Sequence, residues 1–163
     1  MNNDIDIIVN DPALLPHFSR INEEWINDMF TLEATDRDVM ANAQSLIVDR
    51  GGKILYARHR GLGVVGTCAL LKKGESDFEL TKMGVLKSAR GLKIGEKLLV
   101  FAIELAQTMD IENLFLLTNH RCEAAIHLYY KHGFRDDDNI MREYGPLYRR
   151  CDVAMRYTGK PPE

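Results

Sequence analysis

Residues 79–95, ELTKMGVLKSARGLKIG, decide our prediction of the fold, because they join the end of a strand to the start of a long helix. Residues 79–85 have the composition of a strand, but Lys82 interrupts the alternation and a glycine follows at position 84. A glycine inside a strand favours a bulge or the close approach of a ligand to the backbone. We therefore expect an irregular strand here, although tight packing alone would also explain the glycine.

The turn at residues 88–95 precedes the most regular helical pattern in the chain. Apolar or small residues recur on one face of that helix at Gly95, Leu98, Leu99, Ala102, Leu105, Ala106 and Met109. The first N–H groups of a helix lack internal partners and lie at the positive end of its dipole, which favours phosphate binding. Arg90 adds a charge-assisted donor. The turn thus predicts an anion site, or else only a reversal of the chain.

A second helix ends the decisive region, at residues 125–134, AIHLYYKHGF. Ala125, Leu128 and Tyr129 share one face of it, whereas Tyr130 is rotated by roughly 100°. Tyr129 therefore points into the core or into a cleft, and a buried tyrosine needs a partner for its hydroxyl. Gly133 is expected to end the helix in a left-handed conformation.

Taken together, these segments resemble the GNAT superfamily of N-acetyltransferases, and the resemblance covers most of the chain. The superfamily's cofactor motif, Arg/Gln-x-x-Gly-x-Gly/Ala, is matched in order by Arg90, Gly91, Leu92, Lys93, Ile94 and Gly95. Its Leu-Tyr-x-x-x-Gly-Phe signature is matched by residues 128–134. Residues 21–25, 30–33 and 151–155 are similar to one bacterial subgroup of the superfamily.

Two positions depart from the family pattern. Lys93 stands where the motif has its middle glycine, so its side chain must point to solvent or pair with a phosphate. Cys122 stands where many relatives have an asparagine beside the pantetheine arm, and Asn119 lies one helical turn away. The resemblance thus places Asn119, rather than residue 122, among the cofactor-binding residues.

The resemblance implies acetyl-CoA as cosubstrate, no metal, and direct attack of a primary amine on the thioester. It implies that the backbone of Met83, Gly84 and Val85 pairs with the pantetheine amides and supplies an oxyanion donor, while residues 90–95 hold the pyrophosphate. Tyr129 is implied as the acid that protonates the leaving thiolate. Glu79 is our first choice for the base and Glu33 our second.

The chain is expected to have an α+β fold, with a GNAT-like mixed, mostly antiparallel sheet of about seven strands and helices on both faces. We expect one acetyltransferase domain at residues 1–157 and a flexible tail at residues 158–163. The pattern predicts strands at residues 5–9, 45–49, 53–58, 64–71, from 77, 113–117, from 134 and 147–157. It predicts helices that begin after a cap at Asp11, at residues 36–43, after residue 90 and at residues 121–132.

Composition narrows the class of partner. The 163 residues are 45% hydrophobic, carry a net charge of −3 and have a pI of about 6.0, so one domain is expected and a nucleic-acid partner is not. Residues 1–9 lack the basic start of a signal peptide, and no apolar stretch is long enough to cross a membrane. Three cysteines without metal spacing favour the cytoplasm, and the histidines do not predict a metal site.

The acceptor is expected to be a small-molecule or peptide amine. Acidic residues favour a cationic amine, unless they form only a solvated face; they are Glu23, Glu24, Asp28, Glu33, Asp36 and residues 136–138. A homodimer is implied by family analogy alone. Two alternatives remain: a CoA-binding regulatory module without turnover, and a toxin that acetylates aminoacyl-tRNA, which the acidic pI disfavours.

Overall fold

A computed structural model describes residues 4–159, which form a seven-stranded sheet in the order β1-β2-β3-β4-β5-β7-β6. Only β4 and β5 pair in parallel, so the predicted mixed, mostly antiparallel sheet is confirmed. The strands are β1 (Ile5–Val9), β2 (Lys53–His59), β3 (Gly63–Lys72), β4 (Asp77–Val85), β5 (Asn113–Thr118), β6 (Phe134–Asp136) and β7 (Val153–Tyr157).

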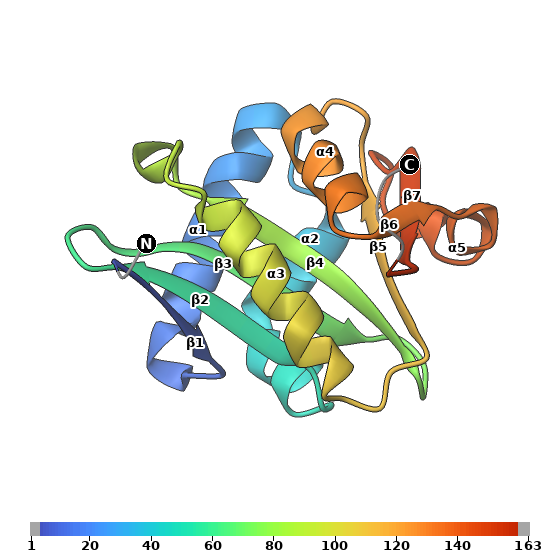
Figure 1. Cartoon of the computed structure of the whole chain (residues 1–163), viewed down its shortest axis with the longest axis horizontal. Coiled ribbons are helices and arrows are strands. Elements are labelled where there is room, and N and C mark those ends of the chain that lie inside the picture. The colour runs from blue at the N-terminus through green and yellow to red at the C-terminus, as the bar shows by residue number, and fades with distance from the viewer. Residues whose placement is uncertain (1–3, 160–163) are drawn as a thin grey trace.

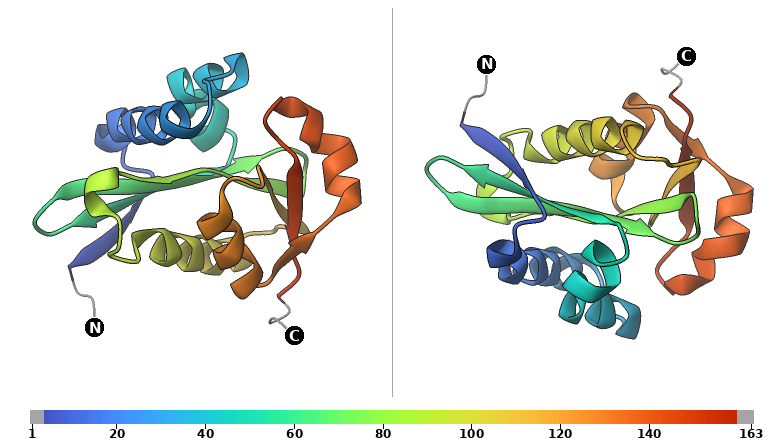
Figure 2. Two further views of the ribbon diagram at one scale, coloured as in Figure 1. Left: turned by 90° about the horizontal axis from the view of Figure 1, so that it is seen from above. Right: turned by 90° about the horizontal axis from the view of Figure 1, so that it is seen from below.

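Helices cover both faces of the sheet (Figure 2). On one face lie α1 (Leu15–Met29) and α2 (Ala34–Ala41), on the other α3 (Ile94–Gln107) and α4 (Glu123–Lys131), while α5 (Asp138–Tyr144) packs on β5 and β7 (Figure 1). Alternate residues of β2 feed two separate cores, with Leu55 on the α3 side and Ile54 on the α1 side. This period of two is what a strand buried on both faces requires.

The predicted helix boundaries are confirmed where capping residues mark them. The Asp11 carboxylate accepts a hydrogen bond from the Ala13 N–H at 3.0 Å and so caps a short 3-10 turn, Pro12–Leu14, that leads into α1. Gly133 ends α4 with a φ of 101°, the left-handed conformation that favours glycine.

Two regions differ from the prediction. Residues 45–49 do not form a strand; a five-residue helical turn, Gln44–Val48, buries Ile47 in the α1-side core, and β1 takes the place beside β2. Residues 147–152 are also not a strand, and the helix α5 was missed. It begins where the Asp137 carboxylate accepts from the Ile140 N–H at 3.0 Å.

The predicted tail at residues 158–163 lies partly outside the described residues. Thr158 and Gly159 donate backbone hydrogen bonds to the Gly133 carbonyl, and residues 160–163 are not described. Across residues 4–159, every helix is too short or too polar to cross a lipid bilayer.

Candidate active site

The central feature of the site is the point at which β4 and β5 part. Their ladder holds only three pairs, from Asp77 with Asn113 to Glu79 with Phe115, and beyond it the strands diverge toward α4 (Figure 1). A cleft of about 440 Å³ opens between them, and Met83, Gly84, Val85, Arg90, Gly95 and Tyr129 are among its lining residues. One edge of β4 therefore faces a cleft instead of a neighbouring strand.

A bulge shapes β4 beside this cleft, as the sequence predicts. The register with β3 shifts between Thr67 and Ala69, and Lys82 adopts a left-handed φ of 54°. The strained residue is thus Lys82, and the nearby Gly84 serves a different purpose. A Cβ at position 84 would overlap the indole of Trp25 on α1, so the glycine allows that helix to approach.

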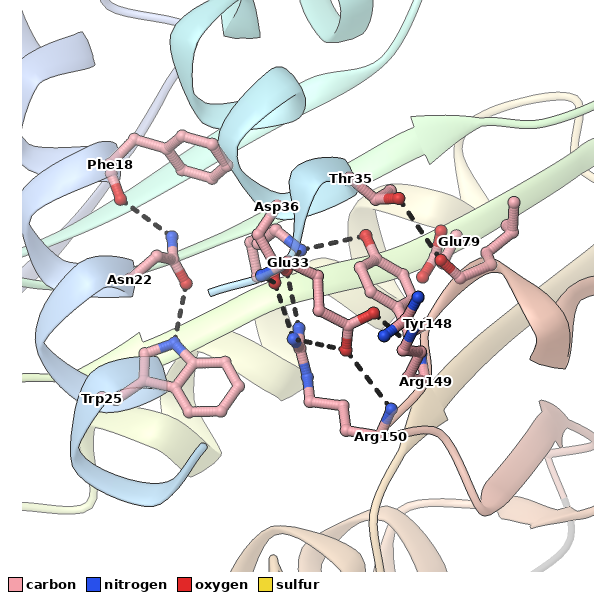
Figure 3. A network of polar contacts seen from close by, with 12 residues as sticks. Phe18, Asn22, Trp25, Glu33, Thr35, Asp36, Glu79, Tyr148, Arg149 and Arg150 are labelled. Atoms are coloured by element: carbon pink, nitrogen blue, oxygen red, sulfur yellow. Dashed lines mark hydrogen bonds and ion pairs between the residues drawn. The ribbon is translucent and has the colours of Figure 1, made fainter. Parts of the chain in front are cut away.

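Trp25 is itself held in place at the cleft wall. Its indole N–H donates to the Asn22 side chain at 2.7 Å, and the Asn22 amide donates to the Phe18 carbonyl at 2.8 Å (Figure 3). Asn22 is fully buried, so this chain fixes the indole from within α1.

The start of α3 provides a place for an anion. Lys93 is the cap residue with a left-handed φ of 61°, its side chain is exposed, and no side chain of residues 4–159 caps the first turn. The N–H groups of this turn therefore remain available, with Arg90 and Gly95 at the cleft wall. Ile94 is buried in the core and offers only its backbone, while Gly91 and Leu92 are exposed. Lys93 is thus accommodated in a glycine-like conformation.

Tyr129 points inward, as predicted, and lines the cleft from α4. Its side chain is 7% exposed and packs edge-on against Phe134, with ring centroids 5.9 Å apart. Burial raises the pKa of the hydroxyl, so it remains protonated at neutral pH. Cys122, at the N-cap of α4, lines the same cleft.

Asn119 lies outside the lining of this cleft. Its amide donates to the Arg150 carbonyl at 2.7 Å and its side-chain oxygen accepts from the Arg121 N–H at 2.9 Å. It lines a smaller adjoining cavity of about 50 Å³, the inner pocket, whose walls also include Trp25, Phe30, Glu79, Tyr148 and Arg150.

Glu79 is the unusual residue of the inner pocket. It is 1% exposed, and its Oε1 accepts no hydrogen bond from residues 4–159. The nearest cation, the Lys73 ammonium, is 3.8 Å away, which is within ion-pair range but too long for a hydrogen bond. Burial raises the pKa of Glu79, and the charges of Lys73 and Lys82 oppose that rise without cancelling it.

The wall of the pocket contains an ion network around the buried Asp36 that the sequence did not predict (Figure 3). The Lys82 ammonium donates to Asp36 at 2.7 Å and to the Tyr148 hydroxyl at 3.0 Å. The Arg150 guanidinium binds both oxygens of Asp36, each at 2.6 Å. Burial alone would raise the pKa of Asp36, but the hydrogen bonds from Arg150 and the charge of Lys82 outweigh it and lower the pKa to about 2. A charged residue in an otherwise buried strand, Lys82, was the available signal.

Glu33, the second candidate base, holds neighbouring segments of the chain together. Its carboxylate caps α2, accepts the Arg149 N–H at 2.8 Å and contacts the Arg150 guanidinium at 3.4 Å. Its oxygens are therefore engaged around the residue 149–150 loop.

Comparisons with known proteins agree with this geometry. Residues 45–136 match a family model described as an acetyltransferase (GNAT) domain. No curated protein matches the sequence significantly. The fold is similar to that of a GNAT-family acetyltransferase from Staphylococcus aureus, with a TM-score of 0.83 and 22% identity over 96% of this chain and 99% of that one.

Two other solved structures share the fold at lower scores. An N-acetylglutamate synthase from Neisseria gonorrhoeae, complexed with coenzyme A and N-acetyl-glutamate, has a TM-score of 0.70 and 19% identity over 96% of this chain and 35% of that one. A spermidine N-acetyltransferase chimera built partly from the Vibrio cholerae protein has a TM-score of 0.70 and 16% identity over 95% of each chain.

Proposed function

Because this chain belongs to the GNAT family of acetyltransferases, we propose that it transfers the acetyl group of acetyl-CoA to a primary amine by direct attack on the thioester. The chain is an N-acetyltransferase, and acetyl-CoA is its cosubstrate. The observation that carries the direct mechanism is the divergence of β4 and β5 beside an uncapped helix start. That divergence leaves room for a thioester with access from two sides.

The cleft suits the shape and charge of acetyl-CoA. The unpaired edge of β4 at residues 83–85 can hydrogen-bond the pantetheine amides as an added strand would. The open N–H groups at the start of α3, with Arg90, suit the pyrophosphate. The solved N-acetylglutamate synthase with the same fold contains coenzyme A.

Transfer then needs three things of the protein. A backbone N–H of residues 83–85 stabilises the oxyanion that forms when the amine attacks the carbonyl. Tyr129, protonated and at the cleft wall, gives its proton to the leaving thiolate. Glu79 accepts the proton that the amine must lose, since an ammonium has no lone pair with which to attack.

Glu79 is preferred to Glu33 as the base because its oxygen is unpartnered at the inner pocket, whereas the Glu33 carboxylate is engaged with α2 and residues 149–150. The raised pKa of Glu79 also makes it a better proton acceptor than an ordinary carboxylate. We place the reaction in the cytoplasm, which the three free cysteines support.

Release of the CoA thiol tests the function directly. The purified chain is incubated with acetyl-CoA and a panel of primary amines, and thiol release above the rate without amine is measured together with the acetylated product. We expect amine-dependent release for at least one class of amine. Tight binding of acetyl-CoA without amine-dependent release would instead support the regulatory CoA-binding module.

A further inference from the structure

Arg121 and Arg150 lie over the ring of Phe30, which lines the inner pocket, and Arg149 lines a groove beside it; Arg121 also lines the larger cleft between β4 and β5. The Phe30 ring, directly after α1, has the Arg121 guanidinium at 5.0 Å and the Arg150 guanidinium at 5.9 Å from its centroid. A groove of about 810 Å³ opens beside it, with Arg149 and Arg150 in its wall. The groove and the inner pocket share Phe30 and Arg150. We call Arg121, Arg149 and Arg150 the arginine rim.

The groove adjoins the inner pocket, and the inner pocket adjoins the cosubstrate cleft. The inner pocket shares Trp25, Thr81 and Lys82 with the cosubstrate cleft. The groove, the inner pocket with Glu79 in its wall, and the cosubstrate cleft therefore adjoin one another in that order through shared lining residues. Two points of recognition thus lie in adjoining cavities.

The charge of the rim is only partly compensated. Arg150 is paired with Asp36 and Glu33. Arg121 and Arg149 are exposed, and in the described part of the chain no carboxylate lies within 4.0 Å of either guanidinium. A guanidinium without a carboxylate partner is well suited to grip one from a ligand, because its planar donors match two oxygens.

The acidic residues expected to attract a cationic acceptor are largely engaged elsewhere. Asp36 is buried between Lys82 and Arg150, and Glu33 holds α2 and the 149–150 loop. Asp28 pairs with the Lys87 ammonium at 2.7 Å, and Glu24 accepts the Lys87 backbone N–H at 3.1 Å. The charge that remains open at the groove is therefore positive.

The inner pocket presents a group of the opposite charge, because Glu79 lies in its wall. The Oε1 of the buried Glu79 accepts no hydrogen bond from residues 4–159 and has only the Lys73 ammonium at 3.8 Å, so an amino group would supply the missing donor. We propose that the acceptor is an amine that also carries a carboxylate, with the carboxylate at the arginine rim and the amino group at Glu79. This inference rests on the proposed function. A polyamine would instead bring a second cation toward three guanidinium groups.

Matched acceptors test the inference by thiol release. Glycine, longer ω-amino acids and several α-amino acids are each compared with the corresponding amide, and spermidine is included. A tripeptide with an acidic second residue distinguishes a peptide source of the carboxylate from a free amino acid. We expect kcat/KM for at least one carboxylate-bearing acceptor to exceed that of its amide about tenfold or more, in line with the loss of one charge-assisted contact.

Variants locate the recognition. Arg149→Gln should reduce the carboxylate-to-amide ratio several-fold while the Kd for acetyl-CoA changes little, and the exposed Arg50→Gln should leave the ratio as it is. Arg121→Gln should also reduce the ratio, and because Arg121 lines the cosubstrate cleft its Kd for acetyl-CoA is measured separately. The inference would be overturned if amides or spermidine had a kcat/KM equal to or higher than that of the carboxylate-bearing acceptors. It would also be overturned if neither rim variant changed the carboxylate-to-amide ratio. Either result would leave the proposed function standing. Absence of thiol release with every amine would overturn the proposed function and the inference with it.

Discussion

Tyr129 and Glu79 are two buried residues with opposite proposed tasks. Burial raises the pKa of both side chains. For the tyrosine, a raised pKa keeps the proton on the hydroxyl but makes it a weaker acid, so its role as donor rests on its position at the cleft wall. For the carboxylate, the same effect makes the ionised form more basic and thus a stronger acceptor of the proton of the amine.

Replacing Tyr129 with phenylalanine removes the proton donor but keeps the packing against Phe134. We expect kcat to fall by roughly 10²–10⁴-fold, with little change in the Kd for acetyl-CoA. Steady-state kinetics and a direct binding measurement check both. Tyr130→Phe is the matched control, because that exposed hydroxyl bonds to Asp136 at 2.7 Å, away from the cleft. A kcat equal to that of the wild type would remove Tyr129 from the mechanism.

Glu79→Gln tests the base through the pH dependence of kcat/KM. Since a base works only when deprotonated, the wild-type rate should fall as the pH drops through the raised pKa of Glu79, above the usual 4.5. Glutamine cannot titrate, so the variant should be slower and should lose this acidic limb. The exposed Glu75→Gln serves as control. If Glu79→Gln retained the limb, the base would have to be sought elsewhere.

At the scale of elements, the fold was predictable where glycines, capping residues and hydrophobic periodicity mark the ends of helices and strands. Each element from β4 through α4 has its own hydrophobic period and is marked by a glycine or a capping residue. The resemblance to the GNAT superfamily then predicted that these elements form one site. Residues 45–49 were misassigned because a short apolar run fits a strand and a helical turn equally well. The sheet position beside β2 went instead to β1, a choice that depends on tertiary packing and not on local pattern.

The ion network could not be predicted for a related reason. Lys82 is 46 residues from Asp36, and Arg150 is 114 residues from it, so no spacing rule joins them. A single sequence shows that each residue is charged but not that their side chains meet.

The start of α3 yields a test of local strain. Lys93 holds a left-handed φ of 61°, which is unfavourable for a residue with a Cβ. Lys93→Gly should therefore stabilise the protein by about 0.5–1 kcal/mol, net of the greater freedom of glycine in the unfolded chain. Urea denaturation measures the change. Gly91→Ala, at a φ of 85° with no atom within 4 Å of the new Cβ, should destabilise by about 1 kcal/mol from backbone strain alone.

The same variant also separates two roles for the lysine. A loss of stability in Lys93→Gly would mean that the side chain contributes contacts that outweigh the strain. A weaker Kd for CoA, with a reduced dependence on salt, would mean that its ammonium pairs with a phosphate.

On the scale of the molecule, the site lies at the parallel junction between the two halves of the sheet. Strands β1–β4 join β5–β7 through only three residue pairs. The Asp36 carboxylate on α2 binds both Lys82 on β4 and Arg150 before β7, so the network links the two sides of that junction. Figure 3 shows Asp36 and Arg150 in contact. The network ties the two halves together beside the opening that the cosubstrate requires, and two of its members, Lys82 and Arg150, also line the cavities there.

This arrangement makes stability depend on pH in a predictable direction. The pKa of Asp36 falls from 3.8 to about 2 on folding, as hydrogen bonds from Arg150 and the charge of Lys82 overcome the effect of burial. At about 1.4 kcal/mol per pH unit the shift is worth ~2 kcal/mol. A lowered pKa means that the folded state binds the proton less readily than the unfolded state. The stabilisation is therefore complete above pH 3.8 and is lost as the pH falls toward 2.

Urea denaturation between pH 2 and pH 7 measures this loss, and Asp36→Asn identifies its source. The variant should lose about 3–5 kcal/mol at pH 7, because the buried Lys82 is left without its hydrogen-bonded counter-ion and Arg150 keeps only Glu33, and its stability should fall less steeply in acid. Asp38→Asn, on the exposed side of the same helix, should retain the wild-type slope. Should Asp36→Asn do no more than Asp38→Asn, the junction between the two halves of the sheet would owe its stability to the three-pair ladder and to apolar packing, and not to the ion network.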